Sequence, residues 1–89
     1  MRFALICHDN PGALPIRLAT RAAHLAYIEQ TGVVEMAGPF LADGQMNGSL
    51  LILDLPDLAA AQEWAANDPY AKAGLFAAVT VTEWKRVIG

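Results

Sequence analysis

Residues 49–55 read Ser-Leu-Leu-Ile-Leu-Asp-Leu, and this stretch decides the fold. An antiparallel strand with one wet face alternates apolar and polar side chains. Residues 50–53 are instead apolar in succession, and residues 3–7, Phe-Ala-Leu-Ile-Cys, repeat the pattern near the N-terminus. Both faces of the predicted sheet therefore carry apolar side chains.

Turn residues divide the chain into alternating strands and helices. We predict strands at 3–7, 33–41, 48–55 and 75–87, helices at 16–31 and 58–67, and a helical turn between Asp68-Pro69 and Gly74. Gly38-Pro39 marks a bulge or the end of pairing, because proline cannot donate to a strand ladder. The order βαββαβ predicts a ferredoxin-like α+β fold, with two helices on one face of an antiparallel sheet.

Two short helices cover only one face of such a sheet. The other face would expose a larger apolar patch than a monomer usually tolerates. The simplest cover is a second copy related by a two-fold axis. We therefore expect a homodimer with its sheets packed face to face. The alternative is a monomer whose strands are assigned wrongly.

Composition bounds the class of protein. The chain has 89 residues, which is one domain (1–89), and it is 55% hydrophobic with 17% charged residues, a balance that excludes disorder. Its net charge of −3 and the lack of a basic stripe argue against nucleic acid as a partner. The longest apolar runs, 3–7 and 75–79, are too short to span a membrane. The single cysteine, Cys7, and the absence of a secretory signal suit the cytoplasm.

Helix 16–31 separates into two arcs at 100° per residue. One arc is apolar and is the predicted core face: Leu18, Ala19, Ala22, Ala23, Leu25 and Ala26. The opposite arc carries Arg17, Arg21 and His24 at i, i+4, i+7 spacing, beside Thr20 and Thr31. This stripe is either a solvated helix face or the polar wall of a pocket for an anionic or phenolic ligand, with His24 transferring protons.

Asp68 also admits two interpretations. Asp followed by Pro at a helix start is typical of a plain cap. Alternatively, its carboxylate orients a neighbouring imidazole and fixes the tautomer. Spacing alone cannot place it beside His24, because 44 positions separate them.

Other candidate residues have weaker patterns. His8 and Asp9 are adjacent in a strand and point to opposite faces, which makes shared metal coordination awkward, so we expect no metal site. Cys7 lies in an apolar strand and is expected to be a buried hydrophobe rather than a nucleophile. Ser49 follows Gly48 at a strand start and is a candidate hydrogen-bond donor. Glycine-rich phosphate loops are absent, and no cofactor is expected.

Five blocks of the sequence together resemble the YCII (YciI-like) family over almost the whole chain. The blocks are Arg21-Ala22-Ala23-His24-Leu25, Ala37-Gly38-Pro39, Gly48-Ser49, Ala60-Ala61-Gln62-Glu63-Trp64-Ala65 and Asp68-Pro69-Tyr70-Ala71-Lys72-Ala73-Gly74. The resemblance implies a ferredoxin-like protomer in a dimeric α+β barrel. It also implies a His-Asp dyad at the positions of His24 and Asp68.

Further site residues follow from the same resemblance. Asp9 matches an acidic position after the first strand, and the binding candidates are Arg21, Asp9, Ser49 and Tyr70. The chain departs from the family at His8, where relatives often carry an amide, and at Tyr27, where others carry a basic residue. The loop between Pro39 and Gly48 is also shorter than in some relatives, so the substrate does not transfer.

The implied chemistry is general acid/base catalysis by His24, oriented by Asp68, with Arg21 or Arg17 stabilising an enolate or phenolate. Similar proteins are linked to removal of chloride from hydroxylated aromatics, so we expect a lyase or isomerase acting on a small cyclic compound. The alternative is a non-catalytic small-molecule binding or sensing module, because the same barrel hosts both. A haem- or oxygen-using enzyme is a weaker third class.

Overall fold

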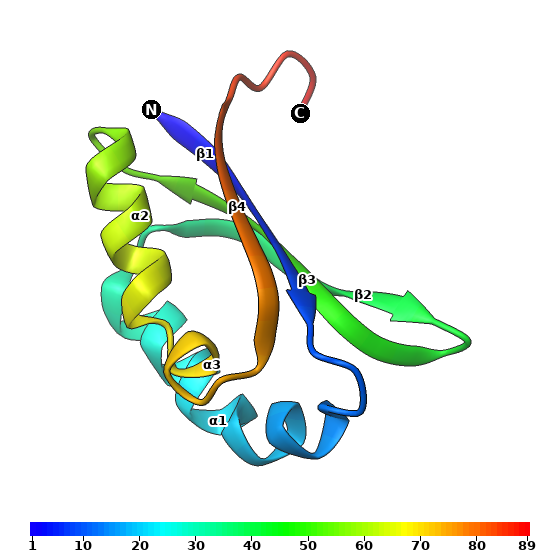
Figure 1. The fold of residues 1–89 in the computed structure, drawn as a ribbon. Helices are drawn as coiled ribbons and strands as arrows, with labels where there is room; N and C mark the ends of the chain where they lie inside the picture. The colour runs from blue at the N-terminus through cyan, green and yellow to red at the C-terminus, as the bar shows by residue number, and fades with distance from the viewer.

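The computed structural model describes all 89 residues as four strands and three helices (Figure 1). The strands are β1 (Arg2–Asp9), β2 (Val34–Ala42), β3 (Gln45–Asp54) and β4 (Phe76–Trp84). The helices are α1 (Leu14–Thr31), α2 (Leu58–Asn67) and the single turn α3 (Pro69–Lys72). The order confirms the predicted βαββαβ arrangement, with α3 following α2 directly.

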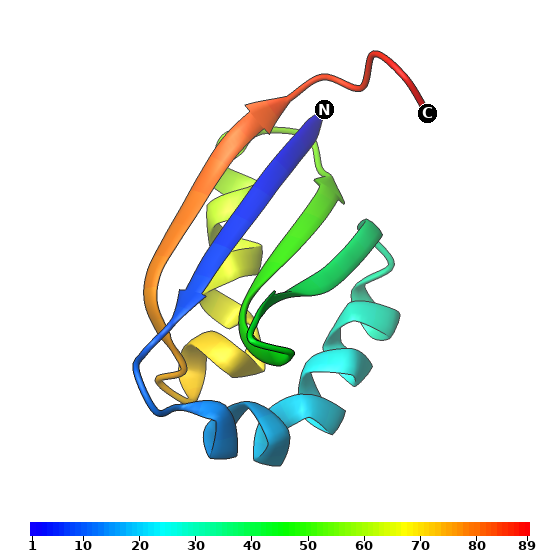
Figure 2. The same ribbon diagram turned by 90° about the vertical axis from the view of Figure 1, so that its right-hand side faces the viewer.

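The strands form one antiparallel sheet in the order β2-β3-β1-β4. All three helices lie on the same side of it (Figures 1 and 2), and the β2–β3 hairpin projects beyond them (Figure 1). Both termini lie at the opposite end of the molecule from α1's first turn (Figure 1). This is the ferredoxin-like α+β fold that the strand patterns predict.

The core lies between the sheet and α2. The odd-numbered residues of β1, Phe3, Leu5 and Cys7, are almost fully buried on this side. Leu5 and Cys7 form one cluster with Leu51 and Leu53 of β3 and with Trp64 and Ala65 of α2. A second small cluster of Ala13, Tyr70 and Leu75 seals the sheet end near α3.

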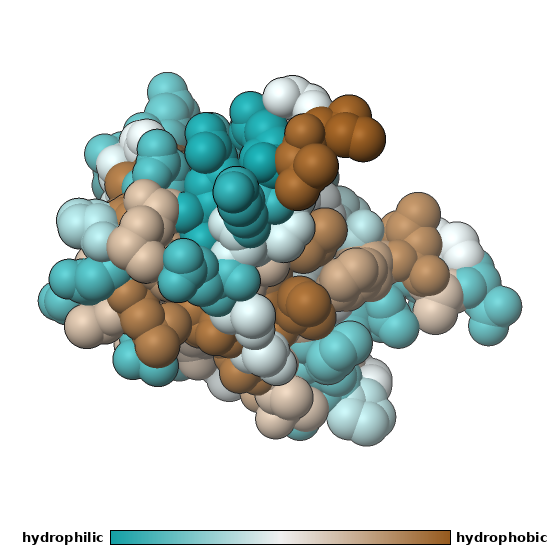
Figure 3. Space-filling view, turned by 90° about the horizontal axis from the view of Figure 1, so that it is seen from above, coloured by the Kyte–Doolittle hydropathy of each residue, from teal (hydrophilic) through white to brown (hydrophobic).

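The other face of the sheet has no helix over it. Cross-strand pairs place Met36 beside Ile52, Ile52 beside Ala4, and Leu50 beside Ile6 on this open face. Met36 and Leu50 are exposed, as is Trp84 at the end of β4. Seen from the end where the termini lie, apolar residues run from the middle of the molecule toward the β2–β3 hairpin (Figure 3). The sheet therefore has two apolar faces, as the run at 50–53 predicts.

Local residues account for the helix ends. Asp57 caps α2 by accepting a hydrogen bond from the Ala60 amide at 2.8 Å. Pro15 stands in the first turn of α1, where its missing N–H costs nothing. Gly32 ends α1 with φ of 64°, and its amide donates to the Ile28 carbonyl.

A network of side chains joins α1 to α2 near the far end of α1. The Tyr27 hydroxyl donates to the Trp64 carbonyl at 2.8 Å, and the Trp64 indole donates to Thr31 Oγ1 at 3.0 Å. Thr31 in turn donates to the Tyr27 carbonyl at 2.9 Å. The Tyr27 and Trp64 rings pack with centroids 4.7 Å apart. Every polar tip in this network has a partner within the protein.

Two predictions about strands need correction. The last strand ends at Trp84 rather than at residue 87, and the exposed Val87 and Ile88 lie outside the sheet. Gly38 and Pro39 do not end strand pairing. They lie within β2 and pair with Leu50 and Ser49 of the neighbouring strand β3. The ladder tolerates proline there because β2 is an edge strand.

The predicted core face of α1 is wrong. Leu18 and Leu25 are 57% and 49% exposed, whereas the buried residues of α1 are Arg17 and His24. Periodicity separates the two arcs correctly, but the apolar arc faces outward, and of the two interpretations of the polar stripe the solvated face is wrong for Arg17 and His24. Buried charged groups are tolerated when they are paired, and both of these side chains have partners.

Gly48 of β3 pairs with His8 of β1 at a point where the two strands leave no room for a side chain. A β-carbon on this residue would lie 2.5 Å from the Cys7 carbonyl oxygen and 3.0 Å from the Phe40 ring. The flanking residues in the same cross-strand row, His8 and Phe40, stack across it with ring centroids 6.0 Å apart. Only glycine fits between these groups without displacing backbone.

We predict that Gly48→Ala lowers the free energy of unfolding by about 1–3 kcal/mol, because the added methyl group forces β1 and β3 apart. Gly38→Ala is the matched control, since a β-carbon there has no atom within 4 Å. That variant should change stability by less than about 0.5 kcal/mol. Urea denaturation measures both, and equal effects of the two substitutions would contradict the packing argument.

Candidate active site

A cavity of about 160 Å³ lies between α1 and the helix-facing side of β2 and β3. Its polar lining residues are Arg17, Arg21, His24, Ser49 and Tyr70. Its apolar lining residues are Leu25, Ile28, Ala37, Pro39, Met46 and Leu51. Polar groups thus gather on one side of a small, partly apolar hollow, which is typical of a small-molecule site.

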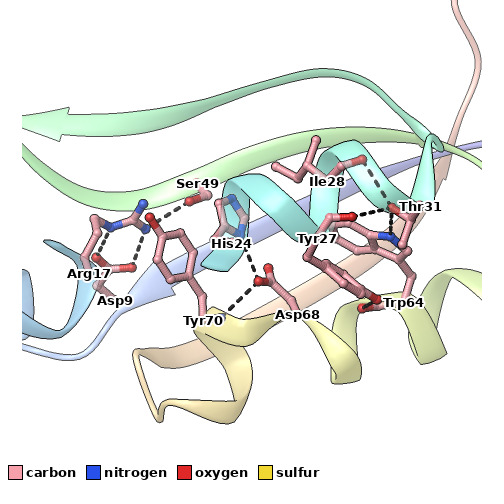
Figure 4. Close-up of polar contacts among 10 residues, drawn as sticks. All are labelled: Asp9, Arg17, His24, Tyr27, Ile28, Thr31, Ser49, Trp64, Asp68 and Tyr70. Carbon is pink, nitrogen blue, oxygen red and sulfur yellow. Dashed lines mark hydrogen bonds and ion pairs between the residues drawn. The ribbon is translucent and has the colours of Figure 1, made fainter. Parts of the chain in front are cut away.

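His24 and Asp68 form a buried pair beside this cavity (Figure 4). His24 Nδ1 lies 2.8 Å from Asp68 Oδ1, although 44 residues separate them in the chain. Asp68 is 0% exposed, and its second oxygen, Oδ2, has no hydrogen-bond partner. Since Nδ1 is bound to the carboxylate, Nε2 is the ring nitrogen left for a ligand.

Tyr70 holds this pair from two directions. Its backbone amide donates to Asp68 Oδ1 at 3.0 Å, so Asp68 both caps α3 and binds His24. Its ring stacks on the His24 imidazole, with centroids 3.9 Å apart and planes 17° from parallel. The Tyr70 ring also packs edge to face with the Phe76 ring of β4, with centroids 5.9 Å apart. The imidazole is therefore held by packing as well as by its hydrogen bond.

Arg17 is fixed one turn of α1 away from Arg21, toward the N-terminus of the helix. Its Nε and Nη2 each lie 2.8 Å from an oxygen of Asp9, a bidentate ion pair that is buried. Nη2 also donates to Ser49 Oγ at 2.9 Å. The guanidinium carbon lies 4.8 Å from the centre of the Tyr70 ring. Arg17 thus links β1, β3 and the turn α3.

Arg21 is the cation that the protein leaves free at the cavity. It lines the hollow and is exposed, and it takes part in none of the ion pairs. Burial raises the pKa of Tyr70, and the positive charges of Arg17 and Arg21 act to lower it. An anionic ligand would meet this side chain at the cavity.

Burial sets the protonation of the neighbouring groups. It raises the pKa of Tyr70, and the positive charges of Arg17 and Arg21 only partly offset this, so the phenol is protonated at neutral pH. Burial works against the charged form of Arg17, but the hydrogen bond and charge of Asp9 outweigh it and raise the Arg17 pKa. Burial, then the negative charge of Asp68, raises the pKa of Cys7 to about 12. Cys7 is therefore a thiol at neutral pH and lacks the thiolate a nucleophile needs.

The structure brings most of the predicted site residues together. His24, Asp68, Tyr70, Arg21 and Ser49 surround or support the one cavity. Asp9 is present as the partner of Arg17 and is engaged by it. Ser49 accepts from Arg17, whereas the sequence predicts only that it donates.

Sequence reasoning missed the apolar side of the cavity. Met46 and Ala37 belong to the hairpin strands, and Leu25 was assigned to the core. No periodic signal identifies these residues, because their role arises from α1 standing away from β2. The i, i+4, i+7 stripe on α1 indicates only the polar wall of the cavity.

His8 and Asp9 do not share a site. His8 lies on the open face against Phe40, whereas Asp9 turns to Arg17 on the helix side. No group of three His, Cys, Asp or Glu side chains is close enough to hold a metal ion. None of the helices has the length and apolar character needed to cross a bilayer.

Comparison with known proteins gives this geometry a context. Protein YciI of Escherichia coli O6:H1 is 34% identical, over 98% of this chain and 99% of its own. The structure of 5-chloro-2-hydroxyhydroquinone dehydrochlorinase (TftG) from Burkholderia phenoliruptrix AC1100, in complex with 2,5-dihydroxybenzoquinone, is 39% identical with a TM-score of 0.89. That match covers 96% of this chain and 94% of the dehydrochlorinase.

The fold is shared more widely than the sequence. A structure described as an antibiotic biosynthesis monooxygenase superposes with a TM-score of 0.56 at 14% identity, covering 96% of this chain and 98% of that chain. This likeness concerns the fold alone, which is that of dimeric α+β barrel proteins. A model of the YCII-related domain matches residues 1–85. The chain therefore belongs to the YCII-related family.

Proposed function

We propose that this protein is a lyase or isomerase that acts on a small hydroxylated or carbonyl-bearing ring compound. The observation that carries the proposal is the buried His24–Asp68 pair at the cavity wall. Support comes from the dehydrochlorinase, which is 39% identical and acts on a chlorinated hydroxyhydroquinone. No cofactor is needed for the steps below.

His24 acts as the proton-transfer group. With Nδ1 donating to Asp68, the free Nε2 has a lone pair that accepts a proton from a substrate hydroxyl or from a carbon beside a carbonyl. Asp68 fixes the tautomer and stabilises the imidazolium that forms. Stacking on Tyr70 keeps the ring in this orientation.

The bonds and charges balance for an elimination. His24 first moves a hydroxyl proton to the ring carbon that bears chlorine, so that the oxygen becomes a ketone and this carbon becomes tetrahedral. His24 then takes a proton from a second hydroxyl group, whose O–H pair forms a second C=O while a ring double bond shifts and chloride leaves with the C–Cl pair. A chlorinated hydroxyhydroquinone thus loses one net proton through His24 and one chloride ion to solvent, and a hydroxyquinone remains. The net change is loss of HCl, which requires no oxidant or reductant. For an isomerisation, His24 returns the proton to another atom of the same ring.

Arg21 supplies charge complementarity. Deprotonation leaves negative charge on the substrate, and the unpaired guanidinium at the cavity stabilises it. The apolar lining of Leu25, Ile28 and Pro39 matches a flat ring and lowers the local dielectric. These features favour a small planar substrate.

We predict that His24→Gln lowers the rate of chloride release from 5-chloro-2-hydroxyhydroquinone by about 10²–10⁴-fold, because glutamine keeps polar contacts but accepts no proton in this range. Asp68→Asn should lower the rate by a smaller factor. His8→Gln is the control, since His8 lies on the open face of the sheet. Thermal unfolding confirms that each variant folds.

An unchanged rate in His24→Gln would contradict the catalytic assignment. If the unaltered protein binds this compound but releases no chloride or other product, the chain is a binding module and not an enzyme. The two outcomes separate the mechanism from the alternative function.

We propose further that a second copy of the chain covers the open face of the sheet. Its central residues are apolar, with Leu50 and Met36 exposed, and no element of this chain covers them. A two-fold contact between two such faces would bury both at once. The cavity lies on the other side of the sheet, so each copy keeps its own site.

The protein is then expected to have twice the chain mass by light scattering after gel filtration. Leu50→Lys should shift it to the monomer, because two lysines would be buried in the shared face. Leu18→Lys is the control, since Leu18 is exposed on α1 and away from that face. A monomeric unaltered protein at micromolar concentration would contradict the proposal.

A further inference from the structure

Two hydroxyl groups at the cavity have no acceptor for their protons. Tyr70 is 2% exposed, yet its hydroxyl donates to no protein atom, while the rest of the side chain is held by stacking. Ser49 is 4% exposed, and its oxygen accepts from Arg17 but its own proton has no partner. Both residues line the cavity, and the Tyr70 hydroxyl is not among the fully buried polar atoms that lack a partner. Buried hydroxyl groups normally donate to an acceptor, so these two hydroxyl groups are available to donate to a ligand in the cavity.

Both hydroxyl groups lie beside the Arg17 guanidinium (Figure 4). Arginine donates hydrogen bonds but accepts none, so it cannot satisfy either proton. Its positive charge instead favours electron density on both oxygens: it donates directly to Ser49 Oγ, and it acts to lower the pKa of the Tyr70 phenol, against the effect of burial. What these groups can bind is therefore an acceptor, and an anionic one best.

Asp9 keeps Arg17 from binding the ligand in their place. It occupies Nε and Nη2 with a bidentate contact, which fixes the guanidinium in place. Arg17 is thus a positioning residue behind the two hydroxyl groups. The Tyr70 phenol stays protonated at neutral pH because burial raises its pKa, so it can donate.

We propose that the Tyr70 and Ser49 hydroxyl groups, backed by Arg17, form a subsite that binds an ionised ring oxygen of the ligand. This deepens the proposed function and rests on it. His24 Nε2 and the subsite then hold two different atoms of one ring. The ligand class is a small ring with one oxyanion and a second group that exchanges a proton, such as a hydroxyquinone or an enolised cyclic dione.

The test uses 2,5-dihydroxybenzoquinone, which is ionised at neutral pH, with hydroquinone as a probe of similar size that is neutral there. Titration calorimetry at pH 7 measures the affinity of each. Tyr70→Phe retains the ring that stacks on His24 and removes only the hydroxyl group. Tyr27→Phe is the matched control, because its hydroxyl binds the Trp64 carbonyl away from the cavity.

We expect Tyr70→Phe to weaken binding of 2,5-dihydroxybenzoquinone by roughly 10- to 100-fold, the range for a hydrogen bond to a charged group. Ser49→Ala should weaken it by a similar or smaller factor. Both variants should change hydroquinone affinity less than about threefold, and Tyr27→Phe should change neither. This charge selectivity separates a binding role from a general loss of packing.

The subsite is overturned if Tyr70→Phe and Ser49→Ala bind the anion as tightly as the unaltered protein. It is also overturned if they lose both probes equally, or if the unaltered protein does not bind the anion. None of these results depends on chloride release in His24→Gln. The subsite and the catalytic role of His24 can therefore fail separately.

Discussion

The contact between His24 of α1 and Asp68 at the start of α3 is the interaction on which the site depends. It joins two helices whose sequences are far apart, and it lies at the wall of the cavity. His24 is the only side chain that hydrogen-bonds Asp68, so loss of either partner leaves a buried polar group with too few bonds. Breaking a buried pair in this way typically costs about 3–5 kcal/mol. The same contact thus holds α1 in place and orients the imidazole.

The inward side of α1 consequently differs from that of an ordinary amphipathic helix. Arg17 and His24 point inward and are paired, while Leu18 and Leu25 are exposed. Because α1 meets the sheet through polar side chains, space remains between them, and this space is the cavity. Strand β3 serves both sides of the sheet, with Ser49 and Leu51 toward the cavity and Leu50 on the open face. Because apolar side chains of β3 are needed on both faces of the sheet, apolar and polar residues do not alternate along this strand.

Much of this architecture could be predicted from sequence, for physical reasons. Uninterrupted apolar strands with turn residues between them define the sheet, and the Gly32 and Asp57 signals define the helix ends. The inversion of α1 could not be predicted, because periodicity shows which residues share a face and not which face is inward. Nor could the spacing of His24 and Asp68 predict their contact, which depends on how α1 and α3 pack. The resemblance to the family supplied that pairing, and the two hydroxyl groups without acceptors emerged only from the structure.

The most direct test of the account is the tautomer of the neutral His24 ring, measured by two-dimensional proton–nitrogen NMR on histidine-labelled protein. The chain has two histidines, so His8→Gln assigns the spectrum. The account predicts that the neutral ring carries its proton on Nδ1, which donates to Asp68, and has an unprotonated Nε2. It predicts also that Asp68→Asn removes this preference for one tautomer. A neutral ring with its proton on Nε2 and a free Nδ1 would contradict the account.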